Sequence, residues 1–299
     1  MSISNQNKIL KIGNAPCSWG IYYPKNNYLK YDKYIKKISE IGYQYSELGP
    51  LGYFNDEISI IKDHLNRNNI HISGATHVHS FANLSNFDEL KSEINKISKI
   101  LLKLNSSNLI IMDDSNFYFK NISRKINIYD WKIIMQNIIK IKNLTENEYG
   151  INLHFHPHVG TFIEYENQID KLLNDTDISI CFDTGHHAYW NQSAINYLKK
   201  IVNRVGYIHL KNVNDTIRQK VWNNEISIEQ SYDSGVMAPL ENGYVNINDI
   251  ITYLLKKEFS GFCIIEQDPE KTKDFDPDNL AKKNLLFVEN IIDQYNNHN

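Results

Sequence analysis

The 299-residue chain has few cysteines and no long apolar run, and neither sign of charge is in large excess. Its three cysteines, Cys17, Cys181 and Cys263, lie far apart without a CxxC pair, which argues against a disulfide framework and a cysteine zinc site. No apolar run approaches the about 18 residues of a membrane-spanning helix, and the first residues lack the apolar core of a secretory signal. We therefore expect a cytoplasmic protein with no membrane partner, because a reducing compartment suits unpaired thiols.

Nucleic acid and the common nucleotide motifs have equally little support. The formal net charge of −3 gives no reason to expect a polyanionic partner. No GxGxxG turn follows the first strand-like run, and the chain has no P-loop. Seven prolines and the lack of any Ser/Gly/Pro-rich tract leave no linker, so we expect one domain over residues 1–299. A hydrophobic content of 41% is enough for a real buried core.

Eight short apolar or alternating runs recur along the chain, and helical patterns separate most of them. The strand-like runs span 8–19, 43–50, 70–77, 108–115, 151–158, 178–186, 205–213 and 261–268. The helical patterns span 30–41, 56–68, 87–105, 129–148, 165–174, 194–203, 246–258 and 278–295. This alternation predicts parallel strands with right-handed crossovers, and at this length an α/β fold of the closed (β/α)8 TIM barrel type. A doubly wound open sheet is the alternative.

The active site of a TIM barrel lies at the carboxyl ends of its strands, and nearly every predicted strand ends in a residue that can titrate, ligate or hydrogen-bond. Seven of the eleven histidines lie at these ends or within two residues beyond them. This concentration predicts a polar site at the barrel mouth. The strand-end residues are Trp19, Glu47, His77, Asp113, Asp114, His156, His158, Asp183, His186, His209, Lys211, Glu266, Gln267 and Asp268.

Strand alternation selects four of these residues as metal ligands. In 151–158 the histidines His154, His156 and His158 share one face, opposite the apolar residues. On the next strands the same rule turns one Asp, one His and one Glu toward the barrel axis. Two imidazoles and two carboxylates suit a borderline divalent ion such as Mn²⁺, Co²⁺, Fe²⁺ or Zn²⁺. A structural His–Asp pair is the alternative for any one residue alone, whereas the joint spacing favours a metal site formed by His156, Asp183, His209 and Glu266.

Six stretches that cover nearly the whole chain in order carry a family resemblance. They are NAPCSWGI, ELGPLGYF, LHFHPHVGT, FDTGHHAYW, HLKNV and IEQDPEK. HPHxGT, DTGH and EQDP together resemble the inosose dehydratases of myo-inositol catabolism, a branch of the xylose isomerase-like TIM barrels. DTGH or HLK alone would indicate only the superfamily.

The resemblance implies the same four metal ligands, with His156 replacing a glutamate that the wider superfamily usually carries. It also implies that His158 faces the substrate and that His154 lies lower as a packed, hydrogen-bonded residue. Two stretches depart from the family, PLENG at 239–243 in place of a Pro-Gly-Asp-Gly turn, and MDDS at 112–115. Both lie where substrate choice could be set, so the resemblance supports the chemistry better than the substrate.

The implied activity is that of a metal-dependent lyase, a hydro-lyase that removes water from a cyclic polyol ketone such as 2-keto-myo-inositol (inosose). Mn²⁺ or Co²⁺ is the preferred cofactor, with Zn²⁺ or Fe²⁺ as alternatives. The residues 212–245 are too long for a simple βα loop, and we expect a helix around 215–230 and a flap over the mouth. The candidates for acid–base catalysis are Lys211, His158, Glu47 and His186, and those for shaping the substrate cavity are Trp19, His77 and Gln267.

Three other functions remain open at this point. A ketose epimerase or isomerase would share the metal but needs two bases on opposite faces of the substrate, and the missing glutamate at His156 weighs against it. A DNA-binding barrel of the AP endonuclease type predicts a basic groove, which the acidic chain lacks. A non-catalytic sugar-binding barrel predicts a lost ligand, and none of the four is lost. We expect a small-molecule polyol ketone as partner, and the sequence is compatible with a homo-oligomer.

Overall fold

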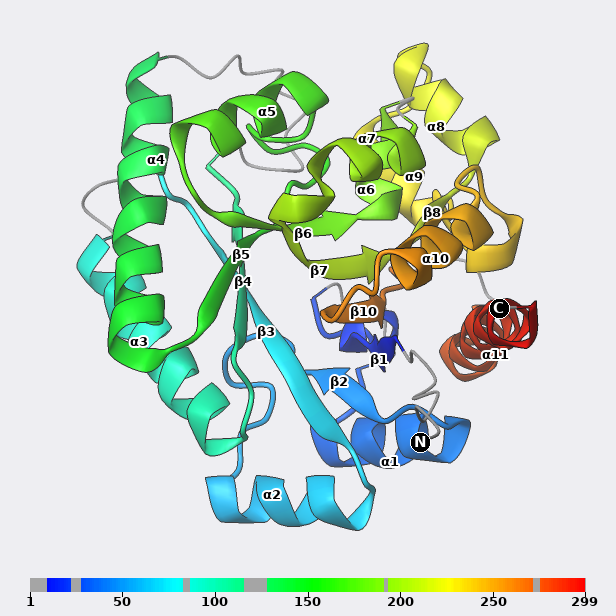
Figure 1. Ribbon diagram of the computed structural model, residues 1–299, viewed down its shortest axis with the longest axis horizontal. Helices are drawn as coiled ribbons and strands as arrows, with labels where there is room; N and C mark the ends of the chain where they lie inside the picture. The colour runs from blue at the N-terminus through cyan, green and yellow to red at the C-terminus, as the bar shows by residue number, and fades with distance from the viewer. Residues whose placement is uncertain are drawn as a thin grey trace, which may run out of the picture.

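Eight parallel strands close into a barrel in the order β1-β10-β7-β6-β5-β4-β3-β2, which confirms the predicted (β/α)8 fold (Figure 1). The computed structural model describes residues 10–22, 28–82, 87–115, 128–190, 193–270 and 275–298. Each predicted strand-like run overlaps one barrel strand, and β3 extends two residues beyond the predicted run 70–77. The strands are β1 (Lys11–Asn14), β2 (Tyr45–Glu47), β3 (His71–His79), β4 (Asn108–Asp113), β5 (Asn152–Phe155), β6 (Ser179–Asp183), β7 (Val205–Leu210) and β10 (Phe262–Ile265).

Helices surround the barrel and bury their apolar faces against the strands (Figure 1). Each predicted helical pattern overlaps one of them, with α4, α5 and α11 extending past the predicted ends by one to three residues, and the end of the 129–148 pattern is a π-helical turn, Leu144–Glu148. No helix of the described residues is long and apolar enough to cross a membrane. The helices are α1 (Tyr31–Ile41), α2 (Ile58–Arg67), α3 (Phe87–Lys103), α4 (Ile128–Asn143), α5 (Glu166–Asp175), α7 (Ala194–Ile201), α10 (Ile247–Lys256) and α11 (Pro277–His298).

The barrel interior is a small core of its own, separate from the larger core beneath the helices. Nearer the amino-terminal end of the strands, His154 has its Nδ1 3.0 Å from the Ser179 hydroxyl and its Nε2 3.0 Å from Asn108 Oδ1. Both ring nitrogens are therefore used in packing below the mouth, as expected. The interior core consists of Ala15, Cys17, Ile110, Cys181, Tyr207 and Ile264.

β3 breaks the simple alternation before the chain reaches His77. The register between β2 and β3 shifts between Ser46 and Glu47. Ser73 and Thr76 therefore both bond inward, Ser73 Oγ accepting from Tyr207 Oη at 2.8 Å and Thr76 donating to Glu47 at 3.1 Å. After this irregularity His77 contacts α3, with its Nε2 3.0 Å from Glu93 Oε2. The structure thus places His77 in a helix contact, and a substrate contact by this residue stays a prediction.

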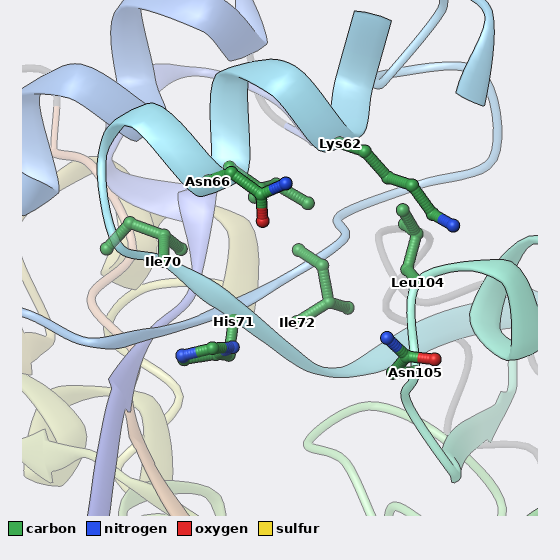
Figure 2. Close-up of a pocket in the computed structure, with 8 residues that line it drawn as sticks. Lys62, Asn66, Ile70, His71, Ile72, Leu104 and Asn105 are labelled. Atoms are coloured by element: carbon green, nitrogen blue, oxygen red, sulfur yellow. The ribbon is translucent and has the colours of Figure 1, made fainter. Parts of the chain in front are cut away.

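A pocket of about 290 Å³ lies between α2, the start of β3 and the end of α3 (Figure 2). Its apolar part is formed by Ile70, Ile72 and Leu104, and Lys62 and Asn66 reach over it from α2. This pocket is at the amino-terminal end of β3. It is therefore at the end of the barrel opposite the carboxyl strand ends.

A short helix that the sequence pattern did not indicate, α6 (Thr184–Tyr189), follows β6 directly. Asp183 begins this helix, because its Oδ1 accepts a hydrogen bond from the His186 backbone N–H at 2.7 Å. The run DTGH, residues 183–186, therefore forms the start of a helix, and the Asp183 carboxylate caps it. His186 is thereby fixed beside the strand end.

The excursion, residues 212–245 between β7 and α10, contains two short helices where we expected one. The second helix forms its own capping box, in which Ser227 Oγ accepts from Gln230 N–H at 3.1 Å and Gln230 Oε1 accepts from Ser227 N–H at 2.8 Å. This second start explains why a single helix over 215–230 was wrong. The elements are β8 (Asn212–Val213), α8 (Asp215–Trp222), α9 (Ile228–Asp233), β9 (Met237–Ala238) and the 3₁₀ turn Leu240–Asn242.

The excursion packs firmly on α6. The Arg218 guanidinium donates to the Ala188 carbonyl and lies 4.4 Å from the Trp222 ring centre and 3.6 Å from that of Tyr244. Trp222 Nε1 donates to the Tyr189 carbonyl at 3.0 Å. Arg218 is among the largest fully buried side chains of the described residues. Through these contacts the excursion packs as a folded segment against α6. Its action as a flap over the mouth stays a prediction.

Glu164 connects the loop after β5 to the end of α6. Its Oε2 accepts from the Gly160 backbone N–H at 2.6 Å and from Trp190 Nε1 at 2.7 Å. Burial raises the pKa of this carboxyl from 4.5 to about 7. The unfolded chain therefore releases the proton at a lower pH than the folded protein does, and the folded state loses stability as the pH rises through this window.

We expect Glu164→Gln, which stays neutral, to lose less melting temperature than the unchanged protein between about pH 5 and about pH 8. Thermal unfolding followed by circular dichroism across this range measures the difference. Glu148→Gln, which removes an exposed carboxylate, is the matched control and should keep the original pH dependence. An equal loss in Glu164→Gln and the unchanged protein would contradict the assignment.

Candidate metal centre

Four side chains from four adjacent strands converge at the barrel mouth, as the sequence pattern predicted. One ligand atom of each lies within 4.8 Å of those of the other three. The atoms Nδ1 of His156, Oδ2 of Asp183, Nδ1 of His209 and Oε2 of Glu266 are buried and have no hydrogen-bond partner in the described part of the chain. Buried polar atoms are normally hydrogen-bonded, so four unsatisfied ones at one point indicate a missing partner that all four share.

A divalent cation fits this arrangement. Glu266 Oε2 and His209 Nδ1 lie 2.8 Å apart without hydrogen-bond geometry, and His209 Nδ1 lies 3.9 Å from Asp183 Oδ2. Buried carboxylate oxygens that face lone pairs are costly unless a positive charge lies between them. Two imidazoles and two carboxylates are donors that Mn²⁺, Co²⁺, Fe²⁺ and Zn²⁺ accept. The donor chemistry and the unsatisfied atoms therefore agree on a divalent metal.

Glu47 lies behind His209, away from the centre's four ligand atoms. His209 Nε2 donates to Glu47 Oε1 at 2.7 Å, and Glu47 is only 2% exposed. With its hydrogen on Nε2, the ring presents the lone pair of Nδ1 to the centre. Glu47 is one of the residues predicted for acid–base catalysis, and this geometry favours instead a role in orienting His209.

Cys17 does the same for Glu266. Its thiol donates to Glu266 Oε1 at 3.1 Å, which leaves Oε2 directed to the other ligands. Burial and the neighbouring carboxylates of Glu266 and Asp268 raise the pKa of the Cys17 thiol well above its ordinary range, so it remains a hydrogen-bond donor. The sequence alone provides no reason to place Cys17 at the site, and its thiol indicates only a reducing compartment. Its position at the end of the first strand was the signal that could have revealed this contact.

Lys211 is buried beside the centre and surrounded by carboxylates. Its Nζ lies 3.0 Å from Asp268 Oδ2, 3.3 Å from Glu266 Oε2 and 3.6 Å from Asp183 Oδ2. Burial alone would lower the pKa of Lys211, but Asp268, Glu266 and Asp183 raise it well above the ordinary value. The side chain is therefore held as an ammonium. Asp268, which supplies the shortest of these contacts, was noted at a strand end but was not among the predicted site residues.

His158 and His186 are two neutral imidazoles on the same side of the centre. Their ring centres lie 3.7 Å apart. Burial, followed by the charge of Lys211, lowers the pKa of His158 to about 3, and burial together with His158 and Lys211 lowers that of His186. His158 Nδ1 lies 2.9 Å from the Val159 carbonyl, so it carries the hydrogen and leaves a lone pair on Nε2. The site therefore combines a fixed cation with two neutral imidazole rings.

Trp19 and Gln267, two predicted substrate residues, connect neighbouring segments of the fold. Trp19 Nε1 donates to Asp278 Oδ1 on α11 at 2.9 Å, and its ring lies 5.2 Å from that of Tyr34 on α1. Gln267 Nε2 donates to the Met237 carbonyl of β9 at 2.6 Å. These contacts favour structural roles, and a substrate contact by either residue stays a prediction.

Comparison with known proteins assigns this chain to one family. The sequence model of the Xylose isomerase-like TIM barrel family matches residues 35–291. The chain belongs to this family. An inosose dehydratase from Clostridium botulinum (strain Alaska E43 / Type E3) is 25% identical over 281 residues, which cover 89% of this chain and 92% of that protein.

Solved structures of the family share the fold at lower identity. The probable 3-DHS dehydratase AsbF, involved in petrobactin synthesis in Bacillus anthracis, is 13% identical, with a TM-score of 0.74 and coverage of 94% of this chain and 99% of that one. The IolI protein with a binding zinc atom is 12% identical, with a TM-score of 0.71 and coverage of 96% and 99%. Both confirm the barrel and leave the substrate of this chain to its own residues.

The contact between Glu47 and His209 predicts an effect on metal affinity. We expect Glu47→Ala to weaken Co²⁺ binding about 10- to 100-fold, because His209 loses the acceptor that fixes its tautomer. A competition titration against a coloured chelator measures the dissociation constant. Glu93→Ala removes the corresponding carboxylate from His77, outside the centre, and should bind Co²⁺ as the unchanged protein does. Equal affinity in the two variants would show that Glu47 does not support the centre.

Proposed function

We propose that this protein is a metal-dependent dehydratase that removes water from 2-keto-myo-inositol or a closely related cyclic polyol ketone. The observation that carries the proposal is the convergence of four unsatisfied ligand atoms at the mouth of the barrel. The inosose dehydratase relative, which matches almost the whole chain, supports the substrate class. The sequence motifs that resemble this branch include all four ligands.

The difficult step in such a reaction is removal of a proton from the carbon beside the ketone. A divalent ion held by His156, Asp183, His209 and Glu266 would polarise the ketone and stabilise the negative charge that develops. We assign the general base to His158, because its Nδ1 is bonded to the Val159 carbonyl and its Nε2 carries a lone pair. Glu47 is committed to His209, and Lys211 is held as a cation, so both are weaker candidates for the base.

Lys211 is suited to the opposite task. Its ammonium can donate a proton to the departing hydroxide or hold negative charge on the substrate oxygen. Its three carboxylate neighbours raise the pKa of Lys211 against the effect of burial, which favours an acid over a base. An acid beside a base suits the loss of a proton and a hydroxide from neighbouring carbons. An epimerase needs instead a second base on the far face of the substrate, and His156 stands where a carboxylate would supply it.

Metal dependence is the first test of the proposed function. Metal-stripped protein should not convert 2-keto-myo-inositol, and added Mn²⁺ or Co²⁺ should restore product, measured by absorbance of the dehydrated enone or dione. His156→Ala should fail even with metal added, because one ligand is lost. His71→Ala, which removes an exposed histidine at the amino-terminal end of β3, is the control and should remain active. Proton exchange with deuterated water without loss of water would favour epimerisation and contradict the proposal.

Removal of the cation should separate chemistry from metal binding. We expect Lys211→Met to lower kcat about 100-fold or more, as is typical for loss of a general acid, while the protein still binds Co²⁺. Steady-state kinetics and the chelator titration give the two quantities independently. Lys142→Met removes a lysine that pairs with Glu146 and Asp177 far from the strand ends, and should leave kcat unchanged. An unchanged kcat in Lys211→Met would exclude the lysine from proton transfer.

A further inference from the structure

The excursion reaches the centre through Tyr232, a residue of α9 that the sequence did not single out. Its hydroxyl oxygen lies 3.4 Å from His186 Nδ1. The other nitrogen of the same ring, Nε2, lies 3.0 Å from Lys211 Nζ. His186 is 2% exposed. Its ring is thus held at both nitrogens by groups from two different segments, α9 and the end of β7.

The direction of these two bonds follows from what each group can donate. Lys211, held among three carboxylates, is an ammonium with hydrogens to give and no lone pair. Nε2 of His186 must therefore accept from Lys211. A neutral imidazole with a lone pair on Nε2 carries its hydrogen on Nδ1, and this hydrogen points to the Tyr232 oxygen. The phenol of Tyr232 is the acceptor that completes the chain from Lys211 through His186.

We propose that Tyr232 is a positioning residue that holds the ring and tautomer of His186, and through them the proton-transfer groups of the centre. His186 lies against His158 at 3.7 Å between ring centres and against the Lys211 ammonium, so a turned ring would disturb both. The kinetic consequence of this assignment rests on the proposed function. The tautomer itself does not, because it is a property of the folded protein without substrate.

The contacts between α6 and α9 explain how Tyr232 keeps its place. Tyr189, three residues after His186 on α6, has its hydroxyl 2.8 Å from Ser231 Oγ, the residue before Tyr232. Residues three apart on a helix face the same side, so α6 presents His186 and Tyr189 together to α9. The capping box at Ser227 fixes the start of α9 four residues earlier. Tyr189 therefore holds the helix, whereas Tyr232 contacts the site.

The role of Tyr232 can be tested with a matched pair of variants. Tyr232→Phe removes only the hydroxyl that meets His186, and Tyr149→Phe removes a hydroxyl that donates to Asn95 Oδ1 at 2.9 Å, away from the centre. We expect kcat to fall about tenfold in Tyr232→Phe with KM within about threefold of the unchanged protein, as for loss of one hydrogen bond that acts on the chemical step. Tyr149→Phe should keep both constants. A loss confined to KM, equal losses in the two variants, or no loss in Tyr232→Phe would overturn the proposal.

A spectroscopic readout tests the same contact without turnover. Long-range proton–nitrogen NMR of imidazole-labelled protein should show His186 with its hydrogen on Nδ1, and His186→Gln identifies the resonance. The Nδ1 signal should move in Tyr232→Phe and stay in place in Tyr149→Phe. A hydrogen on Nε2, or an Nδ1 signal unmoved in Tyr232→Phe, would refute the assignment. If the protein does not convert the polyol ketone at all, the proposed function fails while this measurement still decides the role of Tyr232.

Discussion

Four buried ligand atoms that face one another are the constraint around which the mouth of this barrel is organised. Three of the four residues have a second atom that another group engages, which leaves one atom for the centre. Glu47 accepts from His209, Cys17 donates to Glu266, and the His186 backbone donates to Asp183. Lys211 supplies one positive charge to a site that holds several carboxylates. A divalent cation would balance what the lysine cannot, because buried unpaired charge is strongly unfavourable.

Asp183 links this constraint to the rest of the fold. One of its oxygens starts α6 and the other belongs to the metal ligand set. The orientation of a ligand and the position of a helix are therefore set by a single carboxylate. Because α6 carries His186 and Tyr189, the same interaction determines where the excursion packs. The polar centre and the excursion are thus parts of one hydrogen-bonded arrangement.

The sequence predicted the eight strands and brought the four ligands together because the two-residue period of a strand holds on β5, β6, β7 and β10. It did not reveal the contact of His77 with α3, because the register shift beside Glu47 leaves no mark in the apolar pattern. Tyr232 was missed since its approach to His186 depends on helix packing across 46 residues. The contact of Cys17 with Glu266 joins residues 249 positions apart, and in the sequence a thiol beside an apolar strand resembles a core residue. Local periodicity thus finds what strands present, whereas contacts between distant segments need the fold.

The turn PLENG at 239–243 is packed around the side chain of Asn212. The amide nitrogen of Asn212 donates to the carbonyls of Leu240 and Val245 at 2.8 and 2.9 Å, and its oxygen accepts from the Val245 backbone. A Cβ on Gly243 would lie 2.1 Å from the Asn212 side chain, so only glycine fits at the last position of the turn. Because Asn212 directly follows Lys211 in the chain, the packing of this turn also fixes the backbone beside the buried ammonium. The end of the excursion and the polar centre are therefore connected through one asparagine side chain.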